Sequence, residues 1–139
     1  MTDPKVVEKL LLELSRLVKH LDKMAERPYG DYAADYSLYL GMERALEISV
    51  QCCIDIASHI ISDDDLREPY SYADAFTSLS EAGVIPKSVA DNMEDAAKFR
   101  NLLAHMYAQV DPLRVYSILQ DSRADFGHFM DAIRKYIAR

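Results

Sequence analysis

The sequence predicts an all-α fold, an antiparallel four-helix bundle with one additional short helix. Apolar residues recur at steps of three and four through four long segments, which is the spacing of an amphipathic helix. No segment shows the alternation of apolar and polar residues that is typical of a half-buried strand. The segments are joined by short stretches, and short connections make consecutive helices antiparallel neighbours. At 139 residues, the chain is expected to form a single domain over 1–139.

The first two predicted helices span about 5–26 and 32–61. The first has an apolar stripe at Val7, Leu10, Leu14, Leu17, Leu21 and Met24. The second has a seam at Tyr39, Leu46, Val50, Cys53, Ala57 and Ile60. Asp31 is expected to cap the N-terminus of the second helix. Gly41 costs a helix about 1 kcal/mol relative to alanine, so it is expected to mark the close approach of another helix.

The remaining helices are also bounded by recognisable residues. A short helix is predicted at 72–81, and Gly83 is the glycine often found just after a helix ends. The next helix is expected to begin at Pro86 and to include Tyr107. The last is predicted at 112–137, with Asp111 as its N-cap and a proline in the first turn. Its apolar stripe consists of Tyr116, Leu119, Phe126, Met130, Ile133 and Ile137.

Cysteine usage and the N-terminal sequence favour a cytoplasmic protein. Cys52 and Cys53 are adjacent, lack the spacing of metal ligands and fall in a predicted helix, so we expect reduced packing residues. The first four residues show no basic-then-apolar signal pattern. No run approaches 18 consecutive apolar residues, so no membrane-spanning segment is expected.

Three side chains suited to phosphate chemistry interrupt the apolar pattern of the helix that begins at Pro86. They are Arg100, His105 and Tyr107. The stripe of this helix consists of Val89, Met93, Ala96, Arg100, Leu103 and Tyr107. Arg100 therefore stands where the pattern calls for an apolar residue, and a charge in such a place needs a partner or a function.

Structural explanations for these three residues remain open. Arg100 could be a buried arginine paired with a carboxylate, and His105 could be a hydrogen-bonded core histidine. Tyr107 could simply pack at the end of the stripe. A helix of this composition would then contribute to the core and carry no chemistry.

The order Arg100, Asn101, His105, Tyr107 resembles the signature of HEPN-domain ribonucleases, specifically toxins of the HepT type. The similarity covers about residues 36–110 and includes residues 43–47, Gln51, Asp55, His59, residues 72–76, Leu79 and residues 83–85. The resemblance implies a HEPN-like endoribonuclease toxin that cleaves RNA. It also implies a minimal nucleotidyltransferase antitoxin as partner, which adenylylates the motif tyrosine, here Tyr107.

Arg100 and His105 are the expected catalytic residues. Five positions apart on an ideal helix, they point about 140° away from each other, so one helix cannot easily direct both at one atom. The resemblance implies a homodimer with a cleft across the two-fold axis, where Arg100 of one chain lies near His105 of the other. The imidazole can exchange a proton with a ribose hydroxyl, and the guanidinium can stabilise charge on phosphorus without a metal. Asn101 is expected to hold the imidazole or a phosphate oxygen.

A second set of polar residues recurs every four positions at Glu47, Gln51, Asp55 and His59. A solvated ridge is the simpler interpretation for Glu47. Asp55 and His59 are expected to support the motif helix, because the resemblance expects fixed residues there. One pair without a third ligand is a weak metal site, so neither metal nor cofactor is expected.

The net charge of −7 is unusual for a protein that handles RNA. Residues 31–66 hold eight acids and one base, which accounts for the whole excess, whereas residues 85–110 hold three of each. RNA binding is therefore expected to be weak and salt-sensitive. Two alternatives to the nuclease stay open: a catalytically silent HEPN module that binds nucleotide or assists the transferase, and a purely structural helical adaptor.

Overall fold

The structure is a computed structural model that describes residues 2–139. Its elements are α1 (Pro4–Glu26), α2 (Tyr29–Ala34), α3 (Tyr36–Asp63), α4 (Tyr72–Glu81), α5 (Lys87–His105), the 3-10 helix η1 (Tyr107–Gln109) and α6 (Pro112–Ile137). The described residues form no strand, so the all-α prediction is confirmed.

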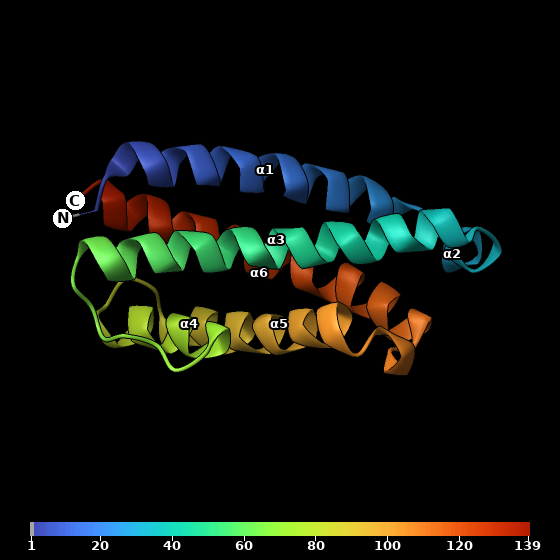
Figure 1. Cartoon of the computed structure of the whole chain (residues 1–139). Coiled ribbons are helices and arrows are strands. Elements are labelled where there is room, and N and C mark those ends of the chain that lie inside the picture. The colour runs from blue at the N-terminus through green and yellow to red at the C-terminus, as the bar shows by residue number, and fades with distance from the viewer. Residues whose placement is uncertain (1) are drawn as a thin grey trace.

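The four long helices α1, α3, α5 and α6 alternate in direction and form a bundle (Figure 1). Helix α1 packs against α3 and α6, and α5 packs against the same two helices. The short α4 lies against α3 and α5. Both termini lie at one end of the bundle, and α2 and η1 lie toward the other (Figure 1). The predicted bundle with a short extra helix is therefore confirmed, and α2 and η1 are additions to it.

Helix α3 forms the centre of the core and contacts every other α-helix. Its predicted seam is buried throughout, and full burial of such apolar side chains contributes roughly 1.5–3 kcal/mol each. By length and composition alone α3 could cross a membrane, but 61% of its most apolar window is buried inside the bundle. The two cysteines are buried free thiols within this helix, as predicted.

Side-chain caps lie at the starts of α1, α3, α4 and α6. Asp111 accepts a hydrogen bond from the backbone N–H of Leu113 at 3.0 Å, which confirms it as the N-cap of α6. The prediction for Asp31 is wrong, because Asp31 lies within α2 and the N-cap of α3 is Asp35. Asp35 is extended, with φ −132°, and so separates two helices that the periodicity had joined.

The two glycines singled out in the sequence behave differently. Gly83 follows α4 with φ +76°, a left-handed conformation that glycine adopts without strain, so its role as a helix terminator is confirmed. Gly41 is exposed, and a Cβ built there would meet no atom within 4 Å. The predicted close approach of a helix at Gly41 is therefore wrong.

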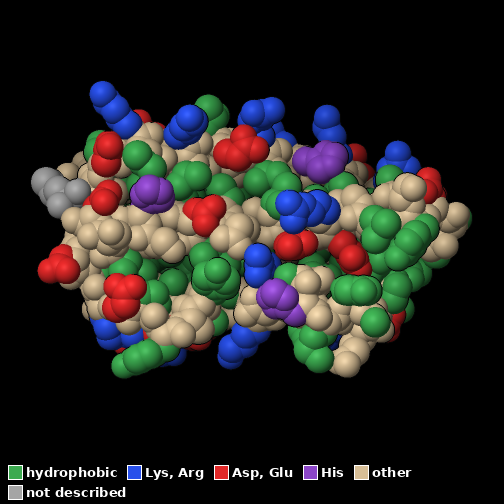
Figure 2. Space-filling model, viewed as in Figure 1, with side chains coloured by type: hydrophobic (Ala, Val, Ile, Leu, Met, Phe, Trp, Pro, Cys, Tyr) green, Lys and Arg blue, Asp and Glu red, His purple; other side chains and the backbone are tan. Residues whose placement is uncertain are grey.

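Charged side chains of both signs are spread over the face that α1, α3 and α5 share (Figure 2). Basic side chains project mainly along α1, and apolar side chains gather near the end that holds α2 (Figure 2). Exposed apolar residues at the start of α3 include Tyr36 and Leu40. This face therefore has no continuous basic surface, which agrees with the uneven charge of the sequence.

Candidate functional site

Helix α5 places the motif among three other helices. It packs against α3, α4 and α6. Its buried residues are Ala90, Met93, Ala97, Phe99 and Leu103. Of the predicted stripe, Met93 and Leu103 are buried, whereas Val89, Ala96 and Arg100 are only partly buried.

Arg100 has no carboxylate partner anywhere in residues 2–139. Its Nη1 donates a hydrogen bond to Oδ1 of Asn101 at 3.3 Å, while its Nε is buried without a hydrogen-bond partner. The guanidinium carbon lies 5.7 Å from the centre of the Tyr72 ring, within the range of a cation–π contact. The interpretation of Arg100 as half of a structural ion pair is therefore wrong. No carboxylate of the described residues neutralises its charge.

His105 is the last residue of α5, and its side chain is exposed. It is not a core histidine. Because α5 is a regular helix through this position, Arg100 and His105 diverge by about 140° around its axis. One chain therefore presents the two groups on different sides of α5.

Tyr107 lies outside α5. The helix ends at His105, Met106 turns the backbone with φ −130° and ψ 38°, and Tyr107 begins η1. The prediction of a continuous helix with Tyr107 on the face of Arg100 is wrong. The backbone leaves the α-helical conformation at Met106, and η1 occupies the connection that leads to the Asp111 cap of α6. Tyr107 is also 71% exposed, so it does not pack into the core.

Asn101 contacts Arg100, and within the described chain it makes no hydrogen bond to His105. Tyr72 is the residue that sequence reasoning missed at this site. It was noted only as part of the segment at 72–76, and nothing in the sequence links it to an arginine 28 positions away. The contact arises because α4 packs on α5.

Asp55 and His59 are exposed on α3. Asp55 accepts a hydrogen bond from Nε2 of Gln51 at 2.9 Å. Leu46 lines the space next to α5, and Asp55 is nine residues further along α3, or about 180° around the helix. Within one chain Asp55 and His59 are therefore not in position to support the motif helix, contrary to the prediction.

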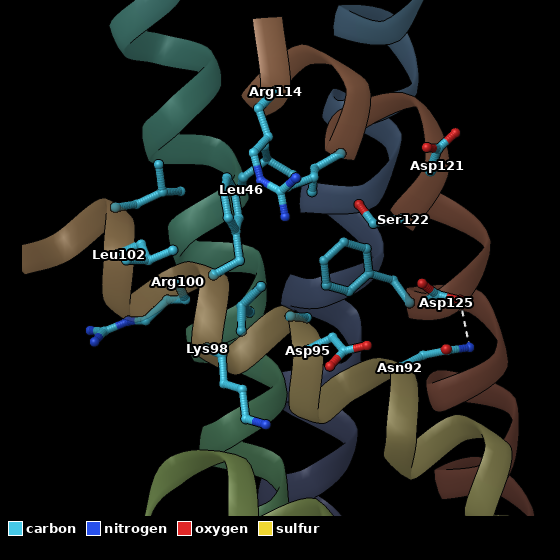
Figure 3. Close-up of a pocket in the computed structure, with 16 residues that line it drawn as sticks. Leu46, Asn92, Asp95, Lys98, Arg100, Leu102, Arg114, Asp121, Ser122 and Asp125 are labelled. Atoms are coloured by element: carbon cyan, nitrogen blue, oxygen red, sulfur yellow. Dashed lines mark hydrogen bonds between the residues drawn. The ribbon is translucent and has the colours of Figure 1, made fainter. Parts of the chain in front are cut away.

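A cavity of about 520 Å³ lies between α5 and α6, with Leu46 and Val50 of α3 in its wall. Arg114 and Ser122 point into it, and at its edge Nδ2 of Asn92 on α5 donates to Oδ1 of Asp125 on α6 at 3.1 Å (Figure 3). Burial raises the pKa of the Asp125 carboxyl. The Arg100 guanidinium points away from this cavity (Figure 3), so only its stem contributes to the lining.

No cluster of three or more His, Cys, Asp or Glu side chains that could hold a metal occurs between residues 2 and 139. The chemistry that the chain presents is thus a partly buried, unpaired arginine, an exposed histidine and an exposed phenol near the C-terminal end of α5. These are groups for binding phosphate and transferring protons.

Comparison with known proteins identifies the family. Residues 14–133 match the family described as "Ribonuclease HepT-like". The chain is 30% identical to the mRNA nuclease HepT of Shewanella oneidensis over 120 residues, which are 84% of this chain and 90% of that one. It is 26% identical to the tRNA nuclease HepT of Aphanizomenon flos-aquae, over 97% of this chain and 92% of that protein.

The fold is also similar to solved structures. One is the tri-AMPylated Shewanella oneidensis HEPN toxin in complex with MNT antitoxin, with a TM-score of 0.83 and 28% identity. That similarity covers 97% of this chain and 99% of the other. The family match spans most of the chain and includes the whole of α5. This chain therefore belongs to the family of HepT-like ribonucleases.

Proposed function

We propose that this chain is the endoribonuclease toxin of a toxin–antitoxin pair, in which Arg100 and His105 cleave RNA and a nucleotidyltransferase neutralises the toxin at Tyr107. The relatives named as mRNA and tRNA nucleases support the general function, as does the AMPylated toxin–antitoxin complex. The buried free thiols Cys52 and Cys53 support a cytoplasmic location.

The main support for the proposal is that Arg100 has no carboxylate partner among the described residues. An arginine that only stabilised the fold would be expected to pair with a carboxylate, because an unpaired buried charge is costly. The described chain offers Arg100 only an amide oxygen and an aromatic ring. An RNA phosphate would supply the missing anion, through charge-assisted hydrogen bonds to the planar fork.

The proposed reaction needs only groups of the protein, the RNA and a water molecule. His105 accepts the proton of a ribose 2′-hydroxyl, and the 2′-oxygen attacks the adjacent phosphorus. The bond from phosphorus to the 5′-oxygen breaks, which leaves a cyclic phosphate, and the departing oxygen then takes a proton from water. Arg100 stabilises the charge that builds up on the phosphoryl oxygens.

A two-fold dimer completes the proposed site. One chain directs Arg100 and His105 to different sides of α5, so a common target requires Arg100 from one chain and His105 from the other. Leu102 is 40% exposed and Met106 is 44% exposed beside these residues. A partner packed on this end of α5 would cover both of them, which favours a symmetric contact.

Tyr107 is the proposed point of regulation. Its exposed phenol can enter the active site of another enzyme, where it loses its proton to a base or to water. Its oxygen can then attack the α-phosphorus of ATP, and the bond to the β-phosphate breaks with release of pyrophosphate. The attached AMP would place a bulky anion two residues from His105. That anion would repel the RNA phosphate and offer Arg100 a competing partner.

Cleavage by purified variants tests the catalytic residues. Arg100→Ala and His105→Ala should each abolish RNA cleavage and growth inhibition with helical content unchanged. Lys98→Ala and His59→Ala are matched controls, an exposed cation on the same helix and an exposed histidine outside the motif, and both should cut normally. Cleavage that survives in His105→Ala would contradict the assignment. Loss of cleavage in excess chelator would contradict metal independence.

A further inference from the structure

Two arginine–tyrosine pairs flank the start of α4, and they differ in the partners of the arginine. The guanidinium carbon of Arg67 lies 5.7 Å from the centre of the Tyr70 ring, and that of Arg100 lies 5.7 Å from the centre of the Tyr72 ring. The two contacts have the same length and involve neighbouring tyrosines. What surrounds the two guanidinium groups is different.

All three guanidinium nitrogens of Arg67 donate hydrogen bonds to carboxylates. Its Nη1 and Nη2 donate to Asp74 at 2.8 and 3.0 Å, and its Nε and Nη2 donate to Glu81 at 2.8 and 3.3 Å. These partners raise the pKa of Arg67, and Arg67 in turn lowers the pKa of Asp74. Ser78 also donates to the carbonyl oxygen of Arg67 at 2.6 Å. Arg67 therefore ties the loop before α4 to the helix.

This tether fixes the position of Tyr72, the first residue of α4. The hydroxyl of Ser71 caps the helix by accepting from the N–H of Asp74 at 3.1 Å, so the backbone on both sides of Tyr72 is held. Tyr72 itself is 50% exposed and is not part of the core. Its ring is thus held at the start of α4, with the Arg100 guanidinium near it and about half of the residue exposed to solvent.

The Tyr72 ring can orient the Arg100 guanidinium without neutralising its charge, which a carboxylate could not do. An arginine that must bind phosphate needs a fixed orientation, because its long side chain otherwise samples many rotamers. A carboxylate would fix it but would occupy its N–H donors and cancel its charge. An aromatic face attracts the cation without using those donors. Among residues 2–139 Arg100 donates one hydrogen bond, from Nη1 to the amide oxygen of Asn101, and its Nε has no partner, so no carboxylate occupies its donors.

We propose that Tyr72 is a positioning residue for the ribonuclease reaction, whose ring orients the Arg100 guanidinium for the RNA phosphate while leaving its charge intact. This inference rests on the proposed function. It assigns a role to the segment between α3 and α5: the Arg67 tether holds the ring, and the ring holds the arginine.

Kinetics with a short fluorogenic RNA tests the role of the ring. Tyr72→Leu should lower kcat/KM by roughly 2- to 30-fold, the range that corresponds to loss of a cation–π contact. Tyr72→Phe keeps the ring face and should retain the wild-type rate. The matched control is Tyr70→Leu, which removes the equivalent contact from Arg67 and should leave the rate unchanged. Circular dichroism measures the folded fraction of each variant, and the rates are expressed per folded protein.

A binding cycle separates this inference from the proposed function. The probe is an uncleavable 2′-O-methyl RNA, with affinity measured by fluorescence anisotropy for Tyr72→Leu, Arg100→Ala and the double variant. If the ring acts through Arg100, the double variant should bind as weakly as Arg100→Ala and no weaker. Additive losses would overturn the inference, as would normal kinetics of Tyr72→Leu or failure of Tyr72→Phe to restore the rate. Failure of the proposed function itself would show differently, as wild-type protein that does not cleave RNA, or cleavage that is indifferent to Arg100→Ala.

Discussion

Mixed dimers provide a quantitative test of the composite site. Arg100→Ala and His105→Ala are each expected to be inactive. Because the two side chains diverge by about 140° on α5, each site should take one of them from each chain. In a dimer of the two variants, one site lacks both residues and the other has both. Random exchange makes half of the dimers mixed, each with one intact site of two, so activity should return to about one quarter of the wild-type value.

The assay mixes the two purified variants at equal concentration and follows cleavage of a fluorogenic RNA as subunits exchange. Native mass spectrometry of chains with different tags measures how much mixed dimer has formed. As a control, Arg100→Ala is mixed with the Arg100→Ala/His105→Ala double variant, a pair that cannot form an intact site. No recovery in the first mixture, despite verified exchange, would place the whole site within one chain and refute the reasoning.

Three further predictions concern regulation, packing and the thiols. Tyr107→Phe should still cleave RNA but gain no mass on co-expression with the nucleotidyltransferase; neutralisation as complete as that of the wild type would argue against the switch. Phe76→Ala should lower the free energy of unfolding by about 3–5 kcal/mol. Phe76 is fully buried, and its ring centre lies 5.7 Å from that of Phe129 in an edge-to-face contact. Urea denaturation at fixed protein concentration measures this loss, and a loss below about 1 kcal/mol would mean that α4 is not docked as the structure has it. Burial raises the pKa of Cys52 to about 11, so roughly one thiol in a thousand is ionised at pH 8. Native protein should then resist alkylation by iodoacetamide at that pH while denatured protein reacts at both cysteines, and rapid labelling of the native fold would contradict the buried position.

The errors of the sequence-based interpretation have a common origin. Apolar periodicity joined the end of α2 to α3 in one helix at about 32–61, because apolar spacing does not reveal the break at Asp35. It extended α5 through Tyr107 for the same reason. A pattern of this kind records which side of the chain faces the core, but it does not record where the backbone turns.

The sequence by itself determined the five main helices, their core stripes and the motif residues, because each depends on local spacing and on residue type. Only the tertiary structure decided what surrounds those residues. It placed Tyr72 against Arg100, left that arginine without a carboxylate, and turned Asp55 away from α5. These outcomes depend on how separate helices pack and rotate against one another, and contacts between side chains that are distant in sequence leave no periodic signal in it.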